Sequence, residues 1–317
     1  MNRRTAIDCL RRGFLSTRAN LGLLWLRLLQ ELLVALLIIG SFLPPLLVLG
    51  GAALLEGEWN ESAVEGWITG LADQLPGKVL ALTLAVVASL VIGLLAVVVW
   101  GWFEGGILGV LIAAERQALP GAENRAGGWR WFRTLSLHDF SGWGGRYVWR
   151  FFWFFHLAMT VGLVLLLFML LLVFGAVYGN ESWGPGAAIG IGCGGALPLV
   201  FAFLIFVLWV SVAQPAVALE GSGALRGSSL ALRIVGRRLG ASLLILLVMV
   251  VAALLVGTVF AVGQGVAGLF VQDSFGALIT LYAVFSLLQM VIGAAINVFG
   301  LAAYSSLVVA EAGGPPR

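Results

Sequence analysis

The sequence predicts an all-α polytopic membrane protein with six transmembrane helices, and three observations support this class. First, 61% of the 317 residues are hydrophobic and only 10% are charged, whereas a soluble domain carries about 25% charged residues. Second, the apolar residues form six continuous runs, each long enough for the roughly 20 residues that cross a bilayer as a helix. Third, arginine is concentrated before alternate runs. Strands of a membrane barrel would instead be about 10 residues long and alternate in polarity.

The six apolar runs give the order of the predicted helices within one integral membrane domain over 1–317. The predicted spans are 21–54, 79–103, 151–178, 187–213, 241–262 and 277–310. The first run exceeds the apolar core of a signal peptide, which is about 7–15 residues long. We therefore interpret it as an uncleaved first helix.

Arginine predicts the topology of these helices, because basic residues are retained on the cytoplasmic side. The stretches before the first, third and fifth runs contain Arg3, Arg4, Arg11, Arg12 and Arg18, then Arg116, Arg125, Arg130, Arg133, Arg146 and Arg150, then Arg226, Arg233, Arg237 and Arg238. The alternate loops contain Glu56, Glu58, Glu61, Glu65, Asp73, Glu181 and Asp273, with Lys78 as their only base. We therefore expect a multi-pass protein of the bacterial inner membrane, with both termini and the segments 104–150 and 214–240 in the cytoplasm.

The second, fourth and sixth predicted helices end alike, shortly after or at the end of their apolar runs, which predicts an internal repeat. Small and aliphatic residues precede a glutamate in 111–115, 216–220 and 307–311. The spacing divides the chain into three hairpin units, 1–115, 116–220 and 221–311. Units related by an axis along the membrane normal keep one orientation. A shared need for small residues at a helix end would produce the same similarity without a repeat.

The glutamates at these ends, Glu115, Glu220 and Glu311, lie at the negative end of a helix dipole, so we expect each to seek a cation. We hypothesise that arginines pair with them and tie the hairpins together at the cytoplasmic face. Arg27 and Glu31, four residues apart, can pair on the first helix. The alternative is that the glutamates lie in water. Candidate arginines are Arg226, Arg233 and Arg237.

The segments that precede the odd-numbered spans predict short amphipathic helices at the cytoplasmic interface. In 225–239, Leu225, Leu232 and Val235 share one helical face, and the arginines lie to another side. The N-terminal stretch repeats the pattern with Ile7, Leu10 and Phe14. Helices of this kind lie in the interface plane with their apolar face toward lipid.

The sequence contains no catalytic or metal-binding signature. His138 and His156 are the only histidines, and HExxH, CxxC and GxSxG patterns are all missing. We therefore predict that the chain is not an enzyme and needs no cofactor or metal. No ionisable residue falls in the middle of a predicted span, which argues against a charge-coupled pump but not against a path for lipid or an apolar solute.

Residues 214–232 carry a family resemblance. The pattern consists of a proline, a glutamate, a leucine, a serine and basic residues, namely Pro215, Glu220, Leu225, Ser228 or Ser229, Arg233, Arg237 and Arg238. This order resembles bacterial six-helix membrane proteins, namely the membrane domain of glycerophosphoryl diester phosphodiesterases and its uncharacterised relatives. In that family the hydrolytic activity belongs to a separate soluble barrel, for which this chain has no room. The resemblance therefore implies the membrane module alone, and no catalytic residue is carried over.

These observations favour a non-enzymatic membrane module that scaffolds a protein partner or engages membrane lipids through its arginine-rich cytoplasmic face. The alternative is a carrier or channel for a lipid or a small apolar solute. Nucleic acid is not an expected partner, because the repeated glutamates would neutralise part of the cationic face.

Overall fold

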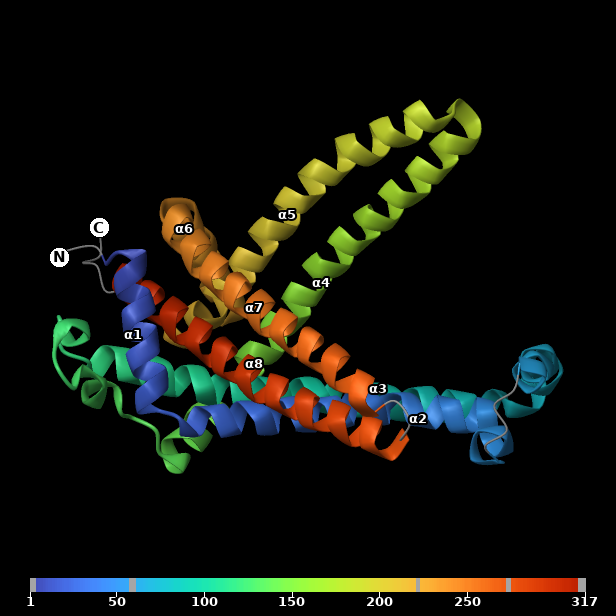
Figure 1. Cartoon of the computed structure of the whole chain (residues 1–317), viewed down its shortest axis with the longest axis horizontal. Helices are drawn as coiled ribbons and strands as arrows, with labels where there is room; N and C mark the ends of the chain where they lie inside the picture. Colours follow the sequence, from blue (N-terminus) through green and yellow to red (C-terminus); the bar gives the residue numbers. More distant parts are fainter. Residues whose placement is uncertain (1–3, 57–60, 221–222, 272–274, 313–317) are drawn as a thin grey trace. The chain divides into compact units, whose positions relative to one another are not determined.

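Among the residues that the computed structural model describes, six helices are long and apolar enough to cross a membrane, as the sequence predicts. The structure describes residues 4–56, 61–220, 223–271 and 275–312 (Figure 1). These residues are almost entirely helical, and no strand occurs among them. The long helices are α2 (Gly22–Glu56), α3 (Glu61–Gln117), α4 (Leu137–Trp183), α5 (Pro185–Glu220), α7 (Leu239–Val271) and α8 (Phe275–Ala312).

Two shorter helices and two 3₁₀ turns complete the described part of the chain. Helix α1 (Ala6–Ala19) precedes α2, and helix α6 (Ala224–Arg237) precedes α7. The turns η1 (Ala122–Asn124) and η2 (Gly128–Phe132) lie between α3 and α4.

The long helices extend beyond the apolar runs that predict them. Helix α3 continues to Gln117 rather than ending near 103, and α4 begins at Leu137 rather than at 151. Hydropathy marks the part of a helix that can lie in lipid, but the backbone hydrogen bonds continue until a cap or breaker stops them. At the start of α4 that cap is Ser136, whose side chain accepts a hydrogen bond from the Asp139 N–H.

The chain divides into two compact units, Met1–Leu28 with Gly101–Arg317, and Leu29–Trp100. The second unit is a helical hairpin made from parts of α2 and α3. Within it, the Gln30 side chain donates a hydrogen bond to the Trp100 carbonyl over 3.2 Å. Large apolar side chains such as Leu36 and Leu80 are exposed in this unit, as expected for a hairpin that faces lipid.

The first unit is organised around α8, against which α1, α5 and α7 pack. Helix α6 packs on α5, and α4 runs along α5 as the other arm of a hairpin (Figure 1). The buried core includes Val212 and Val217 of α5 and Ala303 and Leu307 of α8.

Glycines permit close helix contacts in the first unit, as three of them illustrate. A Cβ atom on Gly13 of α1 would lie 2.8 Å from the backbone nitrogen of Ala303 in α8. A Cβ on Gly144 of α4 would lie 2.8 Å from the Trp102 carbonyl oxygen in α3. Gly227 of α6 approaches α5 in the same way. Small residues at such contacts allow helix backbones to pack closely in membranes.

The apolar residues of α6 that share one predicted face differ in burial. Val235 is buried, whereas Leu225 and Leu232 are exposed. The small residues Gly227 and Ala231 are both buried, and Gly227 makes a close contact with Val217 of α5. Leu225 and Leu232 do not pack in this contact. A small residue such as Gly227 allows α6 and α5 to approach more closely than a leucine would.

Several sequence predictions concern residues outside the described side chains. These residues are Glu220 and the loop acids Glu56, Glu58, Glu61, Glu65, Asp73 and Asp273. Glu181 is described, and it is exposed near the end of α4.

Candidate functional site at the arginine end

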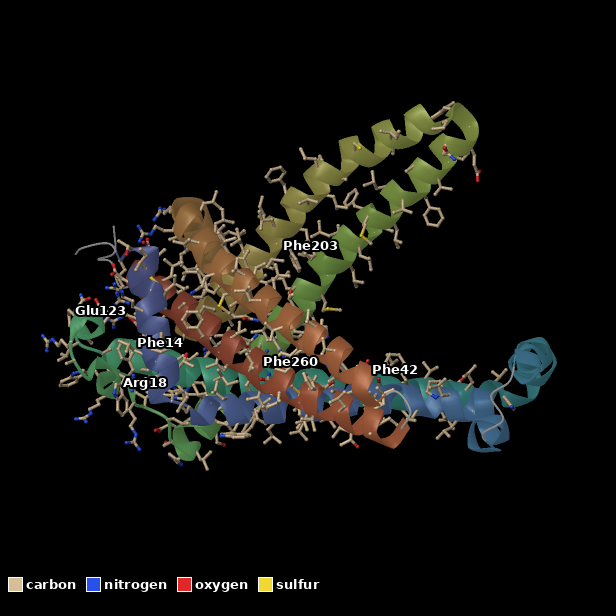
Figure 2. All side chains as sticks on the ribbon, in the orientation of Figure 1. Phe14, Arg18, Phe42, Glu123, Phe203 and Phe260 are labelled. Atoms are coloured by element: carbon tan, nitrogen blue, oxygen red, sulfur yellow. The ribbon has the colours of Figure 1, made fainter. Side chains whose placement is uncertain are left out.

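The polar side chains of the first unit gather at one end, which we call the arginine end. It comprises α1, α6, residues 118–150 and the adjoining C-terminal parts of α3 and α8. Figure 2 shows nitrogen-bearing side chains concentrated there, around Arg18 of α1 and Glu123 of η1, whereas the α4–α5 hairpin around Phe203 carries mainly carbon-rich side chains.

Helix α1 begins with a reciprocal cap. The Thr5 hydroxyl accepts a hydrogen bond from the Asp8 N–H, and the Asp8 carboxylate accepts one from the Thr5 N–H over 2.9 Å. The bonds from the Thr5 N–H and hydroxyl lower the pKa of the Asp8 carboxyl from its usual 3.8. A lowered pKa means that the cap contributes its full stability above pH 3.8, and this contribution is lost as the pH falls through the folded-state pKa.

Glu115, at the C-terminal end of α3, is the centre of a buried ion network. Only 4% of this residue is exposed. Its carboxylate accepts a hydrogen bond from Arg12 Nε over 2.7 Å and pairs with Arg4 as well. Arg4 also donates to the backbone carbonyl and the hydroxyl of Ser306 in α8. One carboxylate therefore joins α1, α3 and α8.

Arg12 is buried to 99% and has further partners. Its Nη1 lies 2.6 Å from a carboxylate oxygen of Glu123 in η1, and its guanidinium lies 4.9 Å from the centre of the Phe132 ring in η2. A buried arginine is tolerated when charge partners and ring faces replace its hydration. Arg12 thereby holds the connection between α3 and α4 against α1.

Arg238, at the junction of α6 and α7, links the remaining elements. Its Nε lies 3.1 Å from a carboxylate oxygen of Glu311 in α8, and its Nη2 donates to the backbone carbonyl of Arg4. Within the described residues, three arginines and three glutamates therefore form one electrically balanced network.

The structure gives the predicted glutamates partners that precede them in sequence. Glu115 pairs with Arg4 and Arg12, and Glu311 pairs with Arg238. The candidate arginines of α6 are exposed, and they make no ion pair with a described residue. These arginines are Arg226, Arg233 and Arg237.

Arg27 pairs with Glu104, a residue that the sequence analysis did not single out. Arg27 Nη1 lies 2.7 Å from the Glu104 carboxylate, and the side chains are 13% and 1% exposed. Glu104 follows the predicted span 79–103 but lies within α3, which extends to Gln117, and so a buried ion pair involves a spanning helix where the sequence predicts the cytoplasmic segment 104–150. A signal was present in the sequence, since Glu104 is the only charged residue between Lys78 and Glu115.

Ten arginines of the arginine end are exposed, and none makes an ion pair with a residue that the structure describes. They are Arg11, Arg18, Arg116, Arg125, Arg130, Arg133, Arg146, Arg226, Arg233 and Arg237. Some lie over indole rings, as Arg18 and Arg130 do over Trp129. Glu115, Glu123 and Glu311 are directed to Arg4, Arg12 and Arg238. The exposed surface of the arginine end is consequently cationic. The expected neutralisation by glutamates applies only to the arginines of the ion network, Arg4, Arg12 and Arg238.

Asn20 fixes the connection between α3 and α4, and the sequence analysis missed it. Its side-chain oxygen accepts hydrogen bonds from the Thr134 and Leu135 N–H groups over 3.1 and 3.0 Å. Its amide nitrogen donates to the Phe132 carbonyl over 2.7 Å. A buried asparagine at a helix end satisfies backbone groups that would otherwise lack partners.

Both cysteines are free, and Cys9 lies beside the ion network. Burial raises the pKa of the Cys9 thiol from 9.0 to about 11. The folded state therefore binds this proton more tightly than the unfolded chain does. The thiol's contribution to stability is complete below pH 9 and is lost as the pH rises from 9 to about 11.

We expect Cys9 to react slowly with a maleimide. A pKa increase of about two units lowers the thiolate fraction at pH 8 by roughly 100-fold. The measurement uses a Cys193→Ser variant, in which Cys9 is the only thiol, and compares labelling in mild detergent and in SDS. Equal rates in the two detergents would contradict a buried, protonated thiol.

No cluster of three or more histidine, cysteine, aspartate or glutamate side chains that could hold a metal occurs in the described part of the chain. No protein-family model, curated protein or solved structure matches the sequence.

Proposed function

We propose that the chain is a non-enzymatic integral membrane module whose arginine end, on the cytoplasmic side, engages anionic lipid headgroups. The observation that carries this proposal is the separation of arginines into two groups. Arg4, Arg12 and Arg238 are bound to glutamates, whereas ten others are exposed and without an ion pair in the described residues. Each exposed arginine close to an anionic membrane surface contributes about 1 kcal/mol.

Exposed apolar side chains beside these arginines support a lipid surface over a soluble protein partner. Ile7 and Phe14 on α1 are each more than half exposed, and so are Leu225 and Leu232 on α6. In both helices the two residues are seven apart, which places them on one side. We propose that α1 and α6 are interfacial amphipathic helices, with these side chains in the acyl region and the neighbouring arginines at the headgroups.

We also propose that the chain contains three repeated hairpin units. Helices α1 and α6 both have 14 residues and both precede a spanning helix. The starts of α1 and α4 share a cap, Thr5 with Asp8 and Ser136 with Asp139. The pre-helix segment of each unit packs on the return helix of another unit, with the start of α4 on α3, α6 on α5, and α1 on α8. The resemblance to the phosphodiesterase membrane domain stays a prediction.

Lipid preference tests the proposed function. The full chain is reconstituted with brominated phosphatidylglycerol or brominated phosphatidylcholine, and quenching of tryptophan fluorescence reports the lipid in contact with the protein. The wild type should favour the anionic lipid. Replacing Arg226, Arg233 and Arg237 with glutamine should reduce that preference by more than about tenfold at low salt, because about 1 kcal/mol per arginine is lost.

A Lys78→Gln variant is the matched control, since it removes a cation from the predicted opposite side of the membrane. It should leave the lipid preference unchanged. A triple variant that keeps the wild-type preference, or a wild type that shows none, would refute the lipid-binding proposal.

A further inference from the structure

Helices α7 and α8 line an open groove of about 590 Å³. Apolar side chains such as Met249, Val256 and Ile296 form much of its lining, and Gly257 and Gly293 leave it open. A Cβ atom placed on either glycine would meet nothing within 4 Å. Ligand pockets of about 300–1,000 Å³ typically combine such apolar walls with a few polar groups.

Three polar side chains line the groove, Ser286, Gln289 and Asn297 of α8. The Asn297 side-chain oxygen is buried and accepts no hydrogen bond from any described residue. An amide oxygen without a partner in an apolar environment is destabilising. Because Asn297 lines the groove, a rotation of its side-chain amide brings this oxygen to the groove, where a ligand hydroxyl that donates a hydrogen bond to it removes that penalty.

Helices α7 and α8 are long and apolar enough to cross a membrane, and the position of the groove along α7 corresponds to the hydrocarbon layer of such a span. Met249 and Gly257 follow the start of α7 by about 15 and 27 Å at 1.5 Å per residue, and the hydrocarbon core is about 30 Å thick. A ligand must therefore be soluble in the membrane. Charged headgroups are excluded at this depth, because an unpaired charge is costly there.

We propose that the α7–α8 groove binds a membrane-soluble molecule with an apolar body and a hydroxyl group, and that the hydroxyl donates to the Asn297 side-chain oxygen. Gln289 and Ser286 can donate to the hydroxyl oxygen, and the two methionines of the groove can adapt to the apolar body. This site is independent of the arginine end, and it is the kind of site that the carrier alternative requires.

The test uses a long-chain primary alcohol with a mid-chain diazirine, and its methyl ether as the matched probe without a donor. The full chain in phosphatidylcholine nanodiscs is irradiated with each probe, and the labelled peptides are identified by mass spectrometry. The alcohol should label the groove, and excess unlabelled alcohol should suppress the labelling. The ether should label about fivefold less, as expected for the loss of one hydrogen bond.

Variants locate the site. Asn297→Leu should reduce labelling by the alcohol to the level of the ether, and it should not impair folding because it removes an unpaired polar atom. Gly257→Leu should fill the groove and abolish labelling. Gly265→Leu is the matched control, because Gly265 also lies on α7 in open space but does not line the groove.

Three results would overturn the proposal. The first is equal labelling by the alcohol and the ether. The second is labelling that persists in Gly257→Leu. The third is disulfide crosslinking of a Gly257→Cys variant to a second copy of the chain, which would make the groove a helix-packing surface.

Discussion

Replacing Glu115 with glutamine should destabilise the folded protein by about 3–5 kcal/mol, the usual cost of removing one partner from a buried ion pair. Arg12 would remain 99% buried without the carboxylate 2.7 Å from its Nε, and Arg4 would lose the same partner. The loss should appear as a lower SDS fraction at the unfolding midpoint when the protein is titrated from mild detergent into SDS.

Two milder variants give the scale for that measurement. Glu123→Gln leaves Arg12 its contact with Glu115, and Glu311→Gln affects a pair whose side chains are about one-fifth exposed. The expected order of destabilisation is Glu115, then Glu123, then Glu311, because solvent screens the more exposed pairs. Equal midpoints for the Glu115 and Glu311 variants would show that the network around Glu115 is not buried.

Replacing Gly144 with alanine should destabilise the protein by about 1–3 kcal/mol through overpacking. The new methyl group would lie 2.8 Å from the Trp102 carbonyl oxygen and 2.9 Å from the indole nitrogen of the same residue. Neither α3 nor α4 can move away without disturbing the Trp102–Phe140 ring contact. The same SDS titration, followed by tryptophan fluorescence, measures the effect.

The adjacent residue provides the control for this substitution. Gly145 lies on the same helix, and a Cβ placed there would meet nothing within 4 Å. Gly145→Ala should therefore stabilise the protein by up to about 1 kcal/mol through helix propensity. Opposite signs for neighbouring glycines would confirm the α3–α4 contact, and destabilisation of similar size at both positions would contradict it.

Some parts of the arginine end could be predicted from the sequence because they depend on local pattern. The glutamates at the ends of α3 and α8 stand out as charges after apolar runs, and Glu115 and Glu311 both pair with arginine. Their partners could not be predicted, because nearness in sequence is a poor guide to nearness in space. Arg12 and Glu115 are 103 positions apart.

Other features were missed because sequence pattern does not show which neighbour a helix packs against. Hydrophobic spacing grouped Leu225 with Val235, yet α6 approaches α5 closely at Gly227 and leaves Leu225 exposed. Hydropathy predicts the end of the second span near 103 and places Glu104 in the cytoplasmic segment that follows, whereas Glu104 is buried beside Arg27.

The sequence by itself determined the membrane class, the number and order of spanning helices and the concentration of arginine before alternate spans. These properties depend on the length and polarity of continuous segments, which bilayer thickness and water solvation constrain directly. Only the tertiary structure decided which arginines are buried with glutamates, which stay exposed, and where α7 and α8 leave a groove. Those outcomes depend on side chains that distant segments bring together, because a buried charge is stable only where packing supplies its partner.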